Sequence, residues 1–162
     1  MTETVIEIAG AGPAGLTAAI SLAKAGREVI VHEAYKEVGY RFGSTYQDFQ
    51  GLENWTTEQD ILELLEQQGI TTDFATLPCY KGTAFDYKQR QYNISSAKPL
   101  FYMLERGPGP RTLDTALLKQ AQSLGVEVKF NSRLKTISGQ GIMAGGPKAA
   151  DAISAGYHFA TE

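Results

Sequence analysis

The feature that most constrains this chain is a glycine-rich turn that joins an apolar run to an amphipathic segment. The stretch Ile6–Ala34 reads IEIAGAGPAGLTAAISLAKAGREVIVHEA. Its pattern predicts a buried strand over Val5–Ala9, a largely buried helix over Pro13–Ala25 that Gly26 ends, and a second strand over Glu28–Glu33. A strand, a helix and a strand within about 30 residues form a crossover unit, which makes the two strands parallel.

Each glycine of the turn has its own steric reason. Gly10, Gly12 and Gly15 form the pattern G-x-G-x-x-G directly after the first strand. Gly10 permits the tight turn, Gly12 lets a pyrophosphate approach the backbone, and Gly15 lets the helix pack closely on the strand. Phosphates are then held by amides at the helix N-terminus, where Pro13 and Ala14 lie. The turn therefore predicts a dinucleotide site.

A carboxylate follows the turn at the distance that dinucleotide-binding proteins use. Glu33, with Ala34 after it, ends the second strand about 20 residues beyond the turn, where it can accept hydrogen bonds from both ribose hydroxyls. A 2′-phosphate would be repelled by Glu33, so NADP is disfavoured and both FAD and NAD stay open. Arg41 could fold back over the adenosine ribose and the pyrophosphate, or it could be a solvated loop arginine.

The remainder of the chain reads as a mixture of helices and strands. Ala34–Trp55 is predicted to be irregular, and Thr56–Gln68 is predicted as a helix with a capping box of Thr56 and Gln59. The spaced aromatic residues of 73–104 predict an antiparallel insertion. A further helix is expected over Thr112–Leu124, with short strands over Val126–Phe130 and Arg133–Ile137.

Composition narrows the class of protein. The chain has 162 residues, which favours a single domain that spans 1–162. Its net charge of −3 argues against nucleic acid as a partner. No apolar run is long enough for a membrane span. Cys79 is the only cysteine, so no internal disulfide can form, and a reducing, cytoplasmic compartment is expected. No spacing of histidine or cysteine suggests a metal site.

These motifs resemble those of FAD-dependent oxidoreductases of the glutathione reductase and p-hydroxybenzoate hydroxylase superfamily, most closely the geranylgeranyl reductase-like branch. The resemblance is carried by three stretches, GAGPAGLTAAISLAKAGREVIVHE, LFYMLERGPGPRTLDTALLKQAQSLGVEVKF and GIMAGGP. In the last of these, Gly145 stands where the family has a threonine. The resemblance implies a Rossmann-like, three-layer α/β domain with a parallel sheet and a small antiparallel insertion.

The resemblance also assigns roles to individual residues. It implies that the glycine turn faces the FAD pyrophosphate, that Glu33 binds the adenosine ribose and that Arg41 lies along the cofactor. Arg106 would approach the diphosphate or ribityl region, although a plain loop role fits it equally. Thr112 and Asp114 would cap the helix that follows and complement its dipole.

Three functions remain open at the level of sequence. The first is FAD binding within an oxidoreductase, which the resemblance extends to an apolar or isoprenoid substrate. The second is a non-catalytic module that binds NAD or AMP. The third is a fragment without independent activity, since family members run to well over twice this length and carry a late Gly-Asp motif that this sequence lacks. No side chain is assigned as a general acid or base.

Overall fold

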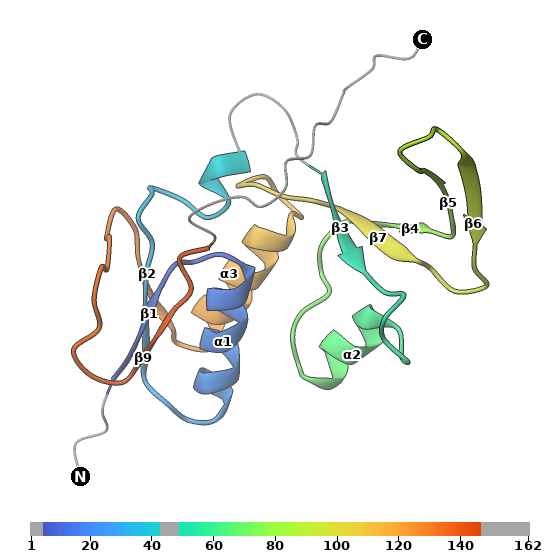
Figure 1. Cartoon of the computed structure of the whole chain (residues 1–162). Coiled ribbons are helices and arrows are strands. Elements are labelled where there is room, and N and C mark those ends of the chain that lie inside the picture. Colours follow the sequence, from blue (N-terminus) through green and yellow to red (C-terminus); the bar gives the residue numbers. More distant parts are fainter. Residues whose placement is uncertain (1–4, 43–48, 147–162) are drawn as a thin grey trace.

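A parallel sheet forms the centre of the structure. The computed structural model describes residues 5–42 and 49–146 (Figure 1). Four strands lie in the order β8 (Glu127–Lys129), β2 (Val29–His32), β1 (Ile6–Ala9) and β9 (Gly141–Met143), and every neighbouring pair is parallel. The predicted crossover unit and the α/β class are therefore confirmed.

Two helices cover one face of this sheet. Helix α1 (Pro13–Lys24) and helix α3 (Leu113–Ser123) lie side by side against it (Figure 1). Alternate strand residues face the helices because successive side chains of a strand point to opposite faces. The buried core that results contains Ile8, Val29 and Val31 from the strands, Leu16, Ala19 and Ile20 from α1, and Leu117 and Ala121 from α3.

The predicted antiparallel insertion is present and lies apart from the parallel sheet (Figure 1). Three strands pair in the order β3 (Phe49–Glu53), β7 (Phe101–Glu105) and β4 (Thr76–Cys79). The two remaining strands, β5 (Lys81–Phe85) and β6 (Gln91–Ser95), form a separate hairpin. Strand β7 leads directly into the loop at 106–112, which joins the antiparallel part of the chain to α3.

Two predicted element boundaries are wrong for a shared reason. The region 34–55 is not irregular throughout, because it holds the short helix η1 (Tyr40–Phe42) and strand β3, which pairs with β7 fifty residues later in the chain. No strand forms over Arg133–Ile137, since β8 occupies the free edge of β2 and β9 occupies that of β1. Both outcomes depend on which distant strand is available for pairing.

The helix predicted over Thr56–Gln68 is shorter than expected. Helix α2 spans Ile61–Gln67, and its N-cap is Asp60, whose carboxylate accepts a hydrogen bond from the amide of Leu62 at 2.9 Å. The Thr56 hydroxyl instead donates to the side chain of Glu53. The predicted capping box is therefore wrong, because an aspartate four residues further along competes for the same role.

A buried polar network joins the start of α2 to the antiparallel sheet. Asn54 is fully buried, and its amide group donates to Pro99 O at 2.7 Å and accepts from Ile61 N at 2.7 Å. The Tyr102 hydroxyl donates to Asp60 Oδ2 at 2.5 Å. Burial, together with this bond to Asp60, raises the pKa of Tyr102 to about 12.

Replacement of Tyr102 by phenylalanine should separate this hydrogen bond from the packing of the ring. At neutral pH we expect Tyr102→Phe to lower the free energy of unfolding by about 1.5–3 kcal/mol, since the bond has a charged acceptor. The phenol has a higher pKa when folded, so its contribution is complete below pH 10.0 and is lost as pH rises toward about 12. Urea unfolding of both proteins across this window checks the expectation. A stability difference that stays constant from neutral pH to pH 12 would contradict it.

Candidate functional site

A cavity of about 520 Å³ opens at the carboxyl ends of the parallel strands. This is the edge of an open α/β sheet at which ligands bind, and the volume lies within the usual range of roughly 300–1,000 Å³. Every residue that the sequence proposed for the cofactor lines it, except Gly15. The lining set includes Gly10, Gly12, Pro13, Ala14, Glu33, Ala34, Arg41 and Arg106.

The three glycines of the turn have three different surroundings. Gly10 has φ +104°, and a Cβ there would lie 2.5 Å from the carbonyl oxygen of Ala144 after β9. A Cβ on Gly15 would lie 1.9 Å from the carbonyl oxygen of Gly10. A Cβ on Gly12 would meet no atom within 4 Å. Gly10 and Gly15 are therefore required by the packing of the fold, whereas Gly12 borders open space in the cavity.

The N-terminus of α1 presents backbone donors to this space. Gly12 is the N-cap, Pro13 follows it, and no side chain caps the helix. The first turn carries no acidic residue. Since the first amides of a helix lack intrahelical partners and lie at its positive end, an anion is favoured here. The site is suited to phosphate oxygens.

Glu33 lies beside the turn and is held in one orientation. Its Oε2 accepts a hydrogen bond from the amide of Ala11 at 2.9 Å, and its Oε1 accepts one from the amide of Tyr35 at 2.9 Å. Each carboxylate oxygen can accept two hydrogen bonds, so each retains one acceptor position. The carboxylate therefore links the turn to the end of β2 and keeps capacity for two further donors.

Arg106 lies in the wall of the cavity in a buried ion pair. Its Nε and Nη2 donate to the two oxygens of Asp114 at 2.8 and 2.9 Å, and Nη1 donates to Gln50. The guanidinium carbon also lies 4.5 Å from the centre of the Phe42 ring. This arrangement is a bidentate pair that is fixed on three sides.

Asp114 and Gln50 are pocket residues that the sequence analysis missed. Asp114 is fully buried and also accepts the amide of Gly107 at 3.0 Å, so it does more than complement the helix dipole. Thr112 caps α3 as predicted, accepting the amide of Thr115 at 3.3 Å. An acidic residue in a first helical turn looks the same in sequence for either role, and only burial distinguishes them.

Two glycines bring the second wall of the cavity into place. A Cβ on Gly39, which has φ +62°, would lie 2.6 Å from the Cα of Gly107. This backbone crossing sets η1 against the loop before α3 and so brings Arg41 and Phe42 to the cavity. Arg41 is itself exposed, with its guanidinium 5.1 Å from the Phe42 ring centre.

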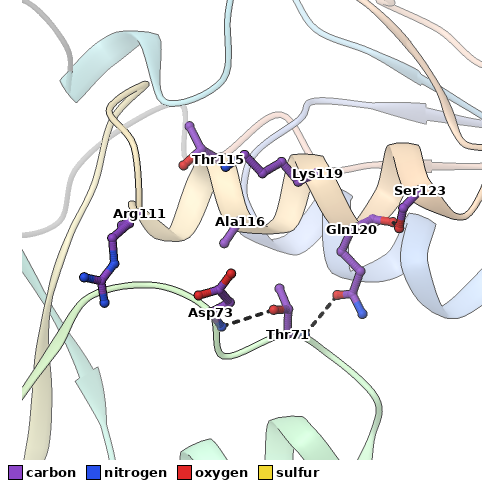
Figure 2. Close-up of a pocket in the computed structure, with 8 residues that line it drawn as sticks. All are labelled: Thr71, Asp73, Arg111, Thr115, Ala116, Lys119, Gln120 and Ser123. Atoms are coloured by element: carbon purple, nitrogen blue, oxygen red, sulfur yellow. Dashed lines mark hydrogen bonds between the residues drawn. The ribbon is translucent and has the colours of Figure 1, made fainter.

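A second cavity of about 370 Å³ lies on the outer face of α3 (Figure 2). Its polar groups already bind one another: Gln120 accepts the amide of Thr71 at 2.9 Å and donates to Gly69 O at 2.8 Å. The Thr71 hydroxyl accepts the amide of Asp73 at 3.1 Å (Figure 2). This cavity therefore marks the contact by which segment 69–73 is held on α3, and the glycine-turn cavity is the better functional candidate.

Comparison with known proteins agrees with the geometry of the glycine-turn cavity. The model of the FAD binding domain family matches residues 2–145. This chain belongs to that family. The cofactor of the domain is therefore FAD, and the alternative of NAD receives no support. Among curated proteins, no sequence matches the chain.

Solved structures of flavoproteins share the fold. A tetrameric form of 2-methyl-3-hydroxypyridine-5-carboxylic acid oxygenase has a TM-score of 0.59 and 24% identity, over 82% of this chain and 33% of its own. A geranylgeranyl bacteriochlorophyll reductase-like protein from Thermoplasma acidophilum has a TM-score of 0.52 and 18% identity, over 79% and 31%. p-Nitrophenol 4-monooxygenase from Pseudomonas putida has a TM-score of 0.52 and 18% identity, over 78% and 31%. The chain thus spans about a third of the length of these structures.

Two kinds of feature are absent from the described residues. Within residues 5–42 and 49–146, no helix has the length and apolar character that a membrane crossing requires. In the same part of the chain, no cluster of three or more histidine, cysteine, aspartate or glutamate side chains is arranged around a metal position.

The ion pair of Arg106 should be costly to break. Removal of one partner leaves a buried, uncompensated charge, so we expect Asp114→Ala to lower the free energy of unfolding by about 3–5 kcal/mol. The matched control is Glu127→Ala, which breaks the exposed Lys129–Glu127 pair and should cost about 0–1 kcal/mol. Denaturant unfolding measures both. Similar losses for the two variants would show that the Arg106 pair is not desolvated as described.

Proposed function

We propose that this chain binds the adenosine and pyrophosphate portion of FAD in a flavin-dependent oxidoreductase. The observation that carries the proposal is the open space at Gly12, beside an uncapped helix N-terminus and a fixed carboxylate. These three features are what a dinucleotide requires: room for a pyrophosphate, donors for its oxygens and acceptors for ribose hydroxyls. In this proposal, residues 1–162 form one domain.

The chain's own residues divide the work of holding the cofactor. The amides of Gly12, Ala14 and Gly15 would donate to the pyrophosphate, while Pro13, which has no amide hydrogen, would start the first helical turn. Glu33 would accept the ribose hydroxyls, and Ala34 would border the adenosine. Because the amide of Ala11 already fixes Glu33, little ordering remains to be done when the nucleotide binds.

The two arginines would act at the other side of the cavity. Arg106 is neutralised by Asp114, so its role toward FAD would be to shape the wall and donate through its remaining N–H groups. Arg41 is free to lie along the cofactor, as its charge is not engaged by an acidic partner among the described residues. When bound, the flavin supplies the hydride or electron chemistry, while the protein binds and orients it.

The substrate class follows from the sequence resemblance. The geranylgeranyl reductase-like motifs favour an apolar or isoprenoid substrate, and a reductase-like protein of that type is among the structures with the same fold. Oxygenases of small aromatic compounds are also among them. Both substrate alternatives require a flavin cofactor. The cofactor site is therefore the part of the proposal to test first.

A ligand series distinguishes the proposed function from its rivals. A ligand that binds only the native state must stabilise it, by about 2.7 kcal/mol when its concentration is 100 times Kd. We expect the thermal midpoint of the purified chain to rise with FAD and, less strongly, with AMP. A rise with NAD but not FAD would favour the nucleotide module, and no rise with any ligand would favour a fragment that binds nothing alone.

The substitution Gly12→Ser tests the turn without disturbing the fold. Serine is a favourable N-cap, and a Cβ at Gly12 meets no atom within 4 Å, so the free energy of unfolding should be unchanged or higher by up to about 1 kcal/mol. The hydroxyl would occupy the donors and space needed by the pyrophosphate, so FAD affinity should fall at least about tenfold, which corresponds to 1.4 kcal/mol.

The control for this substitution is Gly139→Ser, which adds the same atoms to open space away from the cavity. Isothermal titration with FAD, with thermal unfolding in parallel, measures both variants. Wild-type FAD affinity in Gly12→Ser would refute the assignment of the turn, because the added side chain cannot avoid a phosphate seated there.

A further inference from the structure

The hairpin of β5 and β6 presents aromatic side chains to the outside of the fold. Every residue of β6 is exposed, and the loop between the strands lies at the far end of the molecule from the parallel sheet (Figure 1). We call residues 85–92 the hairpin tip. Its three aromatic residues are 64%, 87% and 48% exposed, in the order Phe85, Tyr87 and Tyr92. Exposed apolar groups that gather in one place mark an interaction surface.

The longer segment that contains the hairpin tip has a net charge opposite in sign to that of the whole chain. Residues 76–98 contain four basic residues, Lys81, Lys88, Arg90 and Lys98, and one acidic residue, Asp86. That gives the segment a charge of +3 within a chain whose total is −3, so the rest carries −6. All four basic residues are exposed, but Lys98 donates to the carbonyl oxygens of Thr57 and Glu58 and Arg90 pairs with Asp86, which leaves Lys81 and Lys88 for an outside partner. The aromatic surface is thus also the basic part of an acidic protein.

The single acidic side chain of the tip, Asp86, forms its hydrogen bonds and its ion pair within the loop. Asp86 accepts the amides of Lys88 and Arg90 at 2.8 and 2.9 Å and forms an ion pair with Arg90 Nε at 2.6 Å. The ammonium of Lys88 lies 5.3 Å from the Tyr87 ring centre. The loop therefore exposes the ring of Tyr87 and the ammonium of Lys88 side by side, while the Asp86 carboxylate is bonded within the loop.

We propose that the hairpin tip docks on an anionic lipid surface. Phe85 and Tyr87 would lie in the interfacial layer, where amphipathic rings are favoured, and Lys88 and Lys81 would face lipid phosphates and carboxylates. A surface that is both apolar and anionic satisfies the two chemical characters of the tip at once. A nucleic acid would satisfy the cations and can stack on the aromatic rings, but it offers no apolar layer for Ile94.

Two further features of the hairpin agree with this occupant. A two-stranded hairpin is marginally stable by itself, so a surface that covers it adds stability. Gly82 and Ala84 lie directly across from Ile94 and Tyr92, which makes one face of the hairpin apolar, whereas Phe85 lies across from Gln91 on the other face, so that the two faces meet at the tip. The inference goes beyond the proposed cofactor function and does not depend on it, because no residue of the hairpin lines the glycine-turn cavity.

Sedimentation of the chain with lipid vesicles tests the proposal. We expect binding to vesicles of phosphatidylcholine with phosphatidylserine, little binding to phosphatidylcholine alone, and release at high salt, which screens exposed charges. Lys88→Gln should lower the partition coefficient about fivefold, since each cation near an anionic membrane contributes about 1 kcal/mol. Tyr87→Ser should also weaken binding, and its 87% exposure means that the fold does not depend on it.

The matched control is Lys119→Gln, the same charge change at an exposed position on α3. Loss of binding in this variant equal to that in Lys88→Gln would overturn the proposal, because net charge and not the tip would be responsible. Equal binding to both vesicle types, or no binding, would also overturn it. So would sedimentation without vesicles that Tyr87→Ser abolishes, since a second copy of the chain would then be the occupant. The thermal shift produced by FAD should be the same in Lys88→Gln and wild type, so failure of one proposal does not imply failure of the other.

Discussion

The close approach of helix α1 to strand β1 is the constraint on which the rest of the structure depends. The backbone of Gly15 lies so near the carbonyl of Gly10 that a side-chain carbon there would be 1.9 Å from the oxygen. This contact seats α1 on the sheet, buries Leu16 and Ile20, and aims the first helical amides at the carboxyl ends of β1 and β2. Without it, neither the core nor the cavity would have its present position.

The cavity is built from parts that differ in how firmly they are held. Glu33 is fixed by two backbone amides, and Arg106 is fixed by a bidentate carboxylate, an amide oxygen and a ring. Arg41, in contrast, lies exposed in a single turn of helix. Preformed groups lower the entropic cost of binding, so the ribose side of the cavity is the better prepared half.

The antiparallel part of the chain has two roles. Its inner strands, β3 and β7, hold Gln50 and lead into the loop that carries Arg106, and so contribute to the cavity wall. Its outer hairpin takes no part in that wall and carries the aromatic and basic tip. One insertion thus supports the cofactor site at one end and exposes a chemically distinct surface at the other.

Local patterns in the sequence determined the crossover unit, the steric need for glycine at positions 10 and 15, the carboxylate at the end of β2, and the cap of α3 at Thr112. All of these are encoded within residues 5–34 or within the first turn of α3, where sterics and amide hydrogen bonds decide the outcome. The pairing of β3 with β7, the absence of a strand over 133–137 and the burial of Asp114 against Arg106 were decided by the tertiary structure. Each requires a partner that lies elsewhere in the fold, because strand pairing and desolvation are set by whatever surface is left free once the core has formed.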